Sequence, residues 1–181
     1  MKANIKSILA EIQNRQLDTF CMLEEFRYKR PLVLPRGHCG LYWIWSNLTL
    51  DDLQNMPTSR KTEVPISELV RQQRGSTKIC KIKLKKFTIV YNGIGGKKPS
   101  AKSGGLRERI LQEFKARHEL TGSLNLWYRE GFDIKNWAIS YFDFNDRANE
   151  KIIKHLTYSD HAGILETNWR IEFGMPILTR R

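Results

Sequence analysis

The chain has 181 residues, enough for one domain with a sizeable core, and its 31 Lys and Arg against 19 Asp and Glu give a net charge of +12. This excess favours a polyanionic partner, above all nucleic acid, over a neutral or acidic binding module. The three cysteines have neither paired nor zinc-ligand spacing, which argues against a disulfide scaffold or a zinc knuckle. The chain has no long apolar run, which argues against a signal peptide or a membrane span. We therefore expect a cytoplasmic protein.

Residues 1–36 form the first predicted unit, an N-terminal helical extension. Apolar residues recur at roughly helical spacing between positions 5 and 26, which predicts one or two amphipathic helices with a break near Asn14. Pro31 and Pro35 make the following segment extended. A Gly-rich turn at residues 37–40 then leads into a short apolar strand at residues 41–45.

Residues 46–86 are an insert between the first two core strands, and we regard them as a candidate DNA-reading element. The sequence predicts a turn or short helix at residues 48–54 and a helix that begins at Pro65 and ends at Gly75. Residues 78–85 alternate between apolar side chains and mostly lysine, which predicts a half-buried strand whose lysine row contacts DNA or protects a sheet edge. The candidate contacts, to guanine edges or only to phosphates, are Arg60, Lys61, Arg71 and Arg74.

The most distinctive stretch, residues 91–110, joins an apolar strand at residues 87–91 to a helix that begins at Leu106. The loop between them is rich in Gly, Ser and Lys, which suits a phosphate in front of a helix N-terminus. Its glycine spacing matches neither a P-loop nor a dinucleotide fingerprint, and a surface loop with solvated lysines is the alternative. The remaining predicted elements are helices at residues 106–119, 145–159 and 161–173 and a strand at residues 137–144.

Two tripeptides and two later helix residues occur in a suggestive order. Gly40-Leu41-Tyr42 lies on the first core strand and Tyr91-Asn92-Gly93 at the end of the second, and Arg109 and Glu166 follow on later helices. This order resembles the GIY-YIG nuclease superfamily over residues 40–177, and the long insert and long Gly/Lys loop resemble its type II restriction branch. The resemblance implies a single domain of α/β (α+β) class, with a small three-stranded antiparallel sheet flanked by helices.

The resemblance also implies a set of site residues. Tyr42 and Tyr91 would be the two family tyrosines, Arg109 the helical arginine, and Glu166 the glutamate that binds a metal. Lys97, Lys98 or Lys102 would supply a loop lysine. We take Lys98 as the catalytic candidate, and the candidate DNA contacts near it are Lys97, Lys102 and Arg107.

The chain departs from the family pattern near these residues. Leu41 and Asn92 stand where isoleucine is usual, and Asn92, at a strand end, could face solvent. Thr179 stands where the family's C-terminal Pro-Leu-Asn has asparagine. One turn after the arginine, Glu113 stands where His or Tyr is usual, so Glu113 itself or His118 would have to serve there.

The implied chemistry is Mg²⁺-dependent hydrolysis of phosphodiester bonds, with Mn²⁺ as a substitute. Tyr91 or Tyr42 would take or relay the proton of water, its pKa lowered by surrounding positive charge. Arg109 would brace the phosphate through its planar guanidinium, and Glu166 would hold the metal. Taken singly, these residues have plainer interpretations: two core tyrosines, a helix salt bridge between Arg109 and Glu113, and a solvated Glu166.

From this set we expect a site-specific double-stranded DNA endonuclease of the restriction type. A palindromic target would call for a homodimer with one active site for each strand. Two alternatives remain: a homing or repair nuclease with the same site, and a non-catalytic DNA-binding module whose site has decayed.

Overall fold

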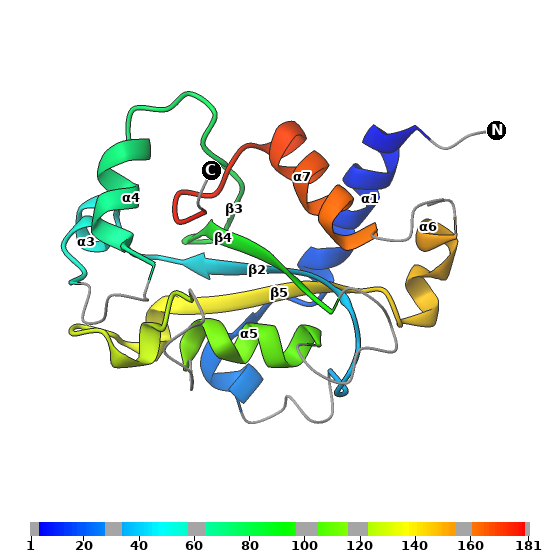
Figure 1. The fold of residues 1–181 in the computed structure, drawn as a ribbon, viewed down its shortest axis with the longest axis horizontal. Coiled ribbons are helices and arrows are strands. Elements are labelled where there is room, and N and C mark those ends of the chain that lie inside the picture. The colour runs from blue at the N-terminus through cyan, green and yellow to red at the C-terminus, as the bar shows by residue number, and fades with distance from the viewer. Residues whose placement is uncertain are drawn as a thin grey trace.

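The structure, a computed structural model, describes residues 4–27, 34–57, 64–96, 105–115, 123–154 and 161–179. Within these residues helices lie on both faces of one antiparallel sheet, whose five strands have the order β1-β5-β2-β4-β3 (Figure 1). The expected α+β class is confirmed. The expected number of strands is wrong, because two strands of two residues each extend the three long strands at opposite edges.

The three long strands form the centre of the sheet and carry both tripeptides. Strand β2 (Gly40–Ser46) lies between β5 (Trp137–Asp143) and β4 (Phe87–Gly95). The register places Gly40 opposite Gly95 and Tyr42 opposite Gly93, so the two tripeptides are direct neighbours. The short strands β1 (Cys21–Met22) and β3 (Lys83–Leu84) pair with β5 and with the start of β4.

Strand β4 contains a β-bulge directly before Tyr91. Ile44 pairs with Tyr91 and Trp45 pairs with Ile89, which leaves Val90 as the extra residue. A bulge interrupts the alternation of side chains and re-aims those that follow. Val90 and Tyr91 accordingly both contact the apolar cluster beside helix α5 (Leu106–Phe114), although they are consecutive in the sequence.

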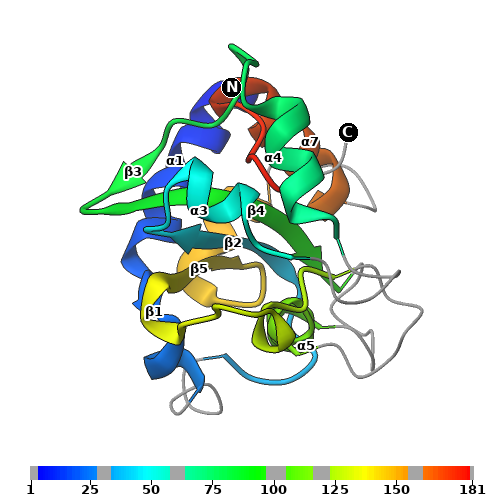
Figure 2. The ribbon, with the colours of Figure 1, turned by 90° about the vertical axis from the view of Figure 1, so that its left-hand side faces the viewer.

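Helices cover the two faces of the sheet unequally. Helix α5 packs on one face, and helices α1 (Ile5–Asp18) and α7 (His161–Phe173) pack on the other (Figures 1 and 2). Leu106, Ile110 and Phe114 follow one another at four-residue spacing, so they form a single buried stripe on α5. On α7 the corresponding buried residues are Leu165 and Trp169, and the latter packs against Trp43 of β2.

The insert folds as two short helices, α3 (Leu50–Gln54) and α4 (Ile66–Gln73), which contact each other. Both were expected, but most of the strand predicted for residues 78–85 is wrong. Only Lys83–Leu84 pairs in the sheet, and Ile79 forms a single bridge to Met175. Lys85, at φ 54°, then turns the chain back into β4 and ends β3.

Two further helix predictions need correction. The break expected near Asn14 lies instead after Asp18, where Thr19 caps α1. The helix expected at residues 145–159 begins as a 3₁₀ turn, η3 (Arg147–Asn149), and continues as α6 (Glu150–Ile153); residues 155–160 lie outside the described residues. Two more 3₁₀ turns, η1 (Leu126–Tyr128) and η2 (Ile134–Asn136), precede β5. In the described part of the chain, no helix combines the length and apolar character needed to cross a membrane.

Candidate active site

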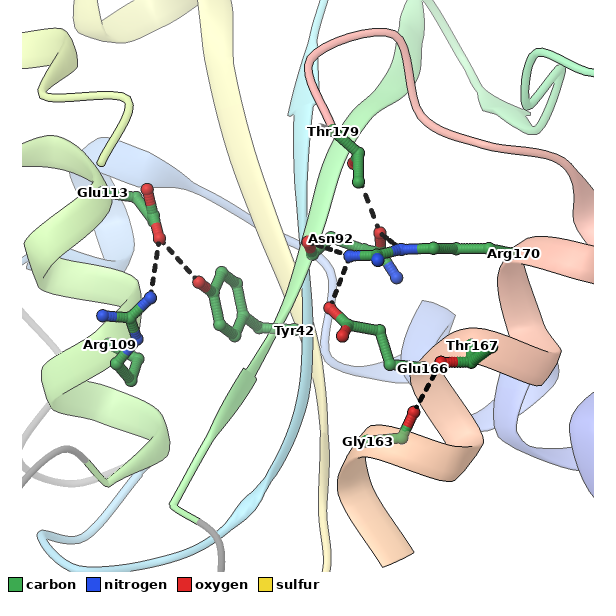
Figure 3. A network of polar contacts seen from close by, with 9 residues as sticks. All are labelled: Tyr42, Asn92, Arg109, Glu113, Gly163, Glu166, Thr167, Arg170 and Thr179. Carbon is green, nitrogen blue, oxygen red and sulfur yellow. Dashed lines mark hydrogen bonds and ion pairs between the residues drawn. The ribbon is translucent and has the colours of Figure 1, made fainter. Parts of the chain in front are cut away.

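Tyr42 extends from β2 toward α5 and ends at Glu113. Its side chain is fully buried, and its hydroxyl donates a 2.8 Å hydrogen bond to Oε1 of Glu113 (Figure 3). The register makes this path possible, because a Cβ at position 93 would overlap the Tyr42 hydroxyl. The glycine of the second tripeptide is therefore needed to accommodate the tyrosine ring of the first.

Glu113 is completely buried, and each of its carboxylate oxygens accepts a hydrogen bond from a protein group. The backbone N–H of Leu124 donates to Oε2 at 2.9 Å, and Nη2 of Arg109, one turn earlier in α5, lies 3.5 Å from Oε1. Burial raises the pKa of Glu113, and the bonds from Leu124 and Tyr42 and the charge of Arg109 oppose that rise. The helix salt bridge is thus present, and it belongs to a larger cluster of Tyr42, Arg109 and Glu113.

Tyr91 is the more open of the two phenols. Its ring centroid lies 6.2 Å from that of Tyr42, but Tyr91 is partly exposed whereas Tyr42 is not. Burial, and then the charge of Glu113, raise the pKa of Tyr91, and Arg109 only partly offsets them; burial and Glu113 also raise the pKa of Tyr42. Among the described groups, desolvation outweighs the nearby guanidinium, so the pKa of neither tyrosine is lowered.

Glu166 lies on α7, on the other side of the sheet from Tyr42 (Figure 3). Its Oε1 accepts a 2.7 Å hydrogen bond from Nη2 of Arg170, one turn further along the helix. Nε of Arg170 in turn donates to Oδ1 of Asn92 at 2.9 Å. Asn92 is 1% exposed, so the expectation that it faces solvent is wrong: it is a buried acceptor for a helical arginine.

The two sides meet at the edge of β4. Strand β3 pairs only with Phe87 and Thr88, and in the described residues no other strand covers the edge at positions 91–95. Burial raises the pKa of Glu166, and the charges of Arg170 and Arg109 lower it. After burial, Glu113 and Arg109, the charge of Glu166 also acts on the pKa of Tyr91. Tyr91, Arg109 and Glu166, from three separate elements, therefore lie within electrostatic reach of one another.

A magnesium ion fits the residues on the α7 side. Within the described ranges no three His, Cys, Asp or Glu side chains gather into a metal-binding group. Mg²⁺ does not require such a group, because it commonly takes one or two carboxylates and completes its shell with water and phosphate oxygens. Of the two carboxylate oxygens of Glu166, only Oε1 has a hydrogen-bond partner among the described residues. The side chain is 14% exposed, so Oε2 is left as a ligand for the metal.

The other predicted contacts fall into three groups. The side chain of Arg107 is buried and donates to Glu108 at 3.2 Å, so little of its guanidinium is available to DNA. Arg71 is exposed on α4, and Arg74 is exposed directly after it and pairs with Asp51 at 2.6 Å. The remaining candidates lie outside the described residues: Arg60, Lys61, Lys97, Lys98, Lys102 and His118.

Comparison of the chain with protein-family models, curated proteins and solved structures gives no match. Functional inference therefore depends on the site itself. Sequence reasoning missed one residue of that site, Arg170. The signal was available, because Glu166 and Arg170 are four residues apart on a predicted helix and such pairs lie on one face.

Proposed function

We propose that this protein is a Mg²⁺-dependent, site-specific endonuclease of the restriction type that hydrolyses phosphodiester bonds in double-stranded DNA. The observation that carries the proposal is that Tyr91, at the edge of β4, lies within electrostatic reach of Arg109 on one side of the sheet and of Glu166 on the other. Hydrolysis of a phosphodiester requires an oriented water and stabilisation of the charge on the phosphate and leaving group. A partly exposed phenol, a guanidinium and a carboxylate on either side of one strand edge could supply these needs.

Each of the three residues has a distinct role in the proposal. Arg109 holds the scissile phosphate, since a guanidinium binds two phosphate oxygens in a planar arrangement. Tyr91 orients the attacking water with its hydroxyl, and its raised pKa keeps it a phenol at neutral pH. Glu166 would hold Mg²⁺ through Oε2. When bound, the ion supplies charge stabilisation for the phosphate and the leaving oxygen.

Tyr42 and Glu113 are buried beneath this site and support it. Tyr42 has no exposed surface, so its hydroxyl is not available to a substrate. Its hydrogen bond to Glu113, together with the bond from Leu124, fixes the carboxylate that pairs with Arg109. We therefore assign both residues to positioning Arg109 and Tyr91.

The substrate class follows from charge. The net charge of +12 favours a polyanion, and Arg71 and Arg74 are exposed on the insert, where they can contact phosphate or guanine edges. Reading of a palindromic sequence by a homodimer is part of the same proposal. Light scattering on the protein with and without a cleaved duplex tests the dimer, and a monomer on that duplex would exclude it.

Digestion of long DNA tests the proposal. The wild-type protein should convert genomic DNA into discrete fragments in Mg²⁺ or Mn²⁺ and leave it intact in EDTA, and Glu166→Ala should leave it intact in all three. Sequencing of the fragment ends would then give the recognition site. A smear or nicks confined to branched DNA would favour the homing or repair alternative.

A non-catalytic DNA-binding module is the second candidate function. It is favoured by one observation: Glu113, at the position where the resembled family has His or Tyr, is completely buried and bonded to Tyr42 and Leu124, so it is not available to a substrate. Binding of DNA without cleavage in Mg²⁺ or Mn²⁺ would support it over the nuclease.

A further inference from the structure

Arg170 lies at the centre of the polar network on the α7 side. Its guanidinium bonds Glu166 Oε1 at 2.7 Å, Asn92 Oδ1 at 2.9 Å and the backbone oxygen of Asn92 at 3.3 Å (Figure 3). Thr179, which is also buried, donates to the same Asn92 Oδ1 at 3.5 Å. The arginine is thereby attached at two points to β4, and its third contact is the glutamate.

The network joins two positions on this side of the sheet at which this chain departs from the pattern of the GIY-YIG nucleases that it resembles. Asn92 stands where isoleucine is usual, and Thr179 stands where asparagine is usual. The structure places these two side chains in contact. One amide is therefore present at this spot, but it comes from β4 instead of from the C-terminal segment.

The buried side chain of Asn92 takes part in this network. A buried amide is costly unless it is hydrogen-bonded, and among the described side chains the partners of Oδ1 are Arg170 and Thr179. An exposed i,i+4 ion pair on a helix would form without any buried anchor and would contribute little. The anchor indicates that the orientation of Arg170, beyond its charge, matters.

We propose that Arg170 is a positioning residue that holds Glu166 in the orientation required to bind a divalent cation, and that Asn92 holds Arg170. This inference rests on the proposed function. Arg170 occupies one carboxylate oxygen and fixes the side chain, which leaves Oε2 for a cation. Residues that orient a metal ligand in this way commonly change metal affinity about 10–100-fold when mutated.

Binding of Mn²⁺ to the full chain, measured as free Mn²⁺ by electron paramagnetic resonance, tests the inference without relying on activity. Asn92→Ile should weaken Mn²⁺ binding about 10–100-fold. The double variant Asn92→Ile with Thr179→Asn, which returns the amide to the C-terminal segment, should regain most of that affinity. Arg170→Lys, which keeps the charge but loses the two-point attachment, should bind Mn²⁺ with intermediate affinity.

The chain offers a matched control on α1. Glu11 and Arg15 form an i,i+4 pair at 3.0 Å that faces solvent, so Arg15→Lys should leave Mn²⁺ binding unchanged. Near-UV circular dichroism verifies folding of each variant, and if Asn92→Ile does not fold, Arg170→Lys decides the matter. The half-saturating Mg²⁺ concentration for DNA cleavage should rise in parallel with loss of Mn²⁺ affinity, with less change in the rate at saturating Mg²⁺.

The possible failures can be told apart. A wild-type protein that cleaves DNA and binds Mn²⁺, with folded Asn92→Ile and Arg170→Lys variants of equal affinity, would overturn the role of Arg170 alone. A wild-type protein that neither binds Mn²⁺ nor cleaves DNA would overturn the proposed function, and with it the inference.

Discussion

Helices α5 and α7 each bring an i,i+4 pair of glutamate and arginine to β4, from opposite faces of the sheet. In Arg109–Glu113 the carboxylate is completely buried and accepts bonds from Tyr42 and Leu124. In Glu166–Arg170 the carboxylate is partly exposed and only Oε1 has a bonded partner in the described residues. The arginines also differ in their partners. Arg170 is held by a buried asparagine, whereas Arg109 is held by partly exposed Gln112 and by Glu113.

The difference shows how two helical Glu/Arg pairs of the same spacing can have different roles. A glutamate whose oxygens are saturated by protein donors cannot also bind a cation, so Glu113 is suited to holding Arg109. A glutamate with one oxygen left over is suited to a metal. In the proposed function the arginine acts on α5 and the glutamate acts on α7, and in each pair the other residue positions its partner.

Substitution of the two tyrosines should give the largest difference between the two sets of residues. Tyr91→Phe should lower the rate of DNA cleavage about 10²–10⁴-fold, because it removes the group that orients water, and it should leave stability almost unchanged. Tyr42→Phe should act mainly on stability, at a cost of about 1–3 kcal/mol, because it removes a hydrogen bond to a buried carboxylate. Single-turnover cleavage and urea unfolding of both variants measure these effects. A larger loss of rate in Tyr42→Phe would reverse the two roles.

Arg109→Lys tests the acting arginine. Lysine keeps the charge but cannot bind two phosphate oxygens in one plane, so we expect a loss of about 10²–10³-fold in cleavage rate. Arg15→Lys on α1 makes the same chemical change in another i,i+4 pair and should leave the rate unchanged. Equal rates for Arg109→Lys and wild type would remove Arg109 from the phosphate site.

Glu113→Gln tests the buried carboxylate through pH. Burial raises the pKa of Glu113 above its unfolded value, so the stability it contributes is fully present below the unfolded pKa and is lost as pH rises through the folded pKa. The wild type should therefore exceed Glu113→Gln by about 1–3 kcal/mol near pH 4, and this advantage should shrink toward pH 8. Urea unfolding at several pH values measures the trend, and an advantage that grows with pH would contradict it.

The smallest expected effect belongs to the insert. Arg71→Ala removes an exposed cation from α4. If Arg71 contacts a phosphate, the slope of log DNA affinity against log salt concentration should become shallower by about 1. The rate of the chemical step should change little. Fluorescence anisotropy over a salt series measures this slope. An unchanged slope would place Arg71 outside the interface.

Much of this arrangement could be predicted from sequence, because it is local. The tripeptides, the stripe of Leu106 and Ile110 on α5, and the extent of α7 all follow from spacing within a few residues.

What could not be predicted depends on contacts between distant segments. The alternation at residues 78–85 predicts a strand, but pairing depends on a partner strand, and in the described residues only Lys83–Leu84 has one in the sheet. The burial of Asn92 follows from its pairing opposite Trp43 and from Arg170, which is 78 residues away. The raised tyrosine pKa values follow from desolvation, which sequence does not report.

In the nuclease that we propose, Glu166 binds the metal and Glu113 does not. Plasmid cleavage by wild type, Glu113→Gln and Glu166→Gln over a range of Mg²⁺ concentrations tests this division of roles. We expect cleavage by wild type, a lower rate with an unchanged half-saturating Mg²⁺ concentration for Glu113→Gln, and no cleavage at any Mg²⁺ concentration for Glu166→Gln. Full activity of Glu166→Gln, or a Mg²⁺ requirement shifted by Glu113→Gln alone, would contradict it.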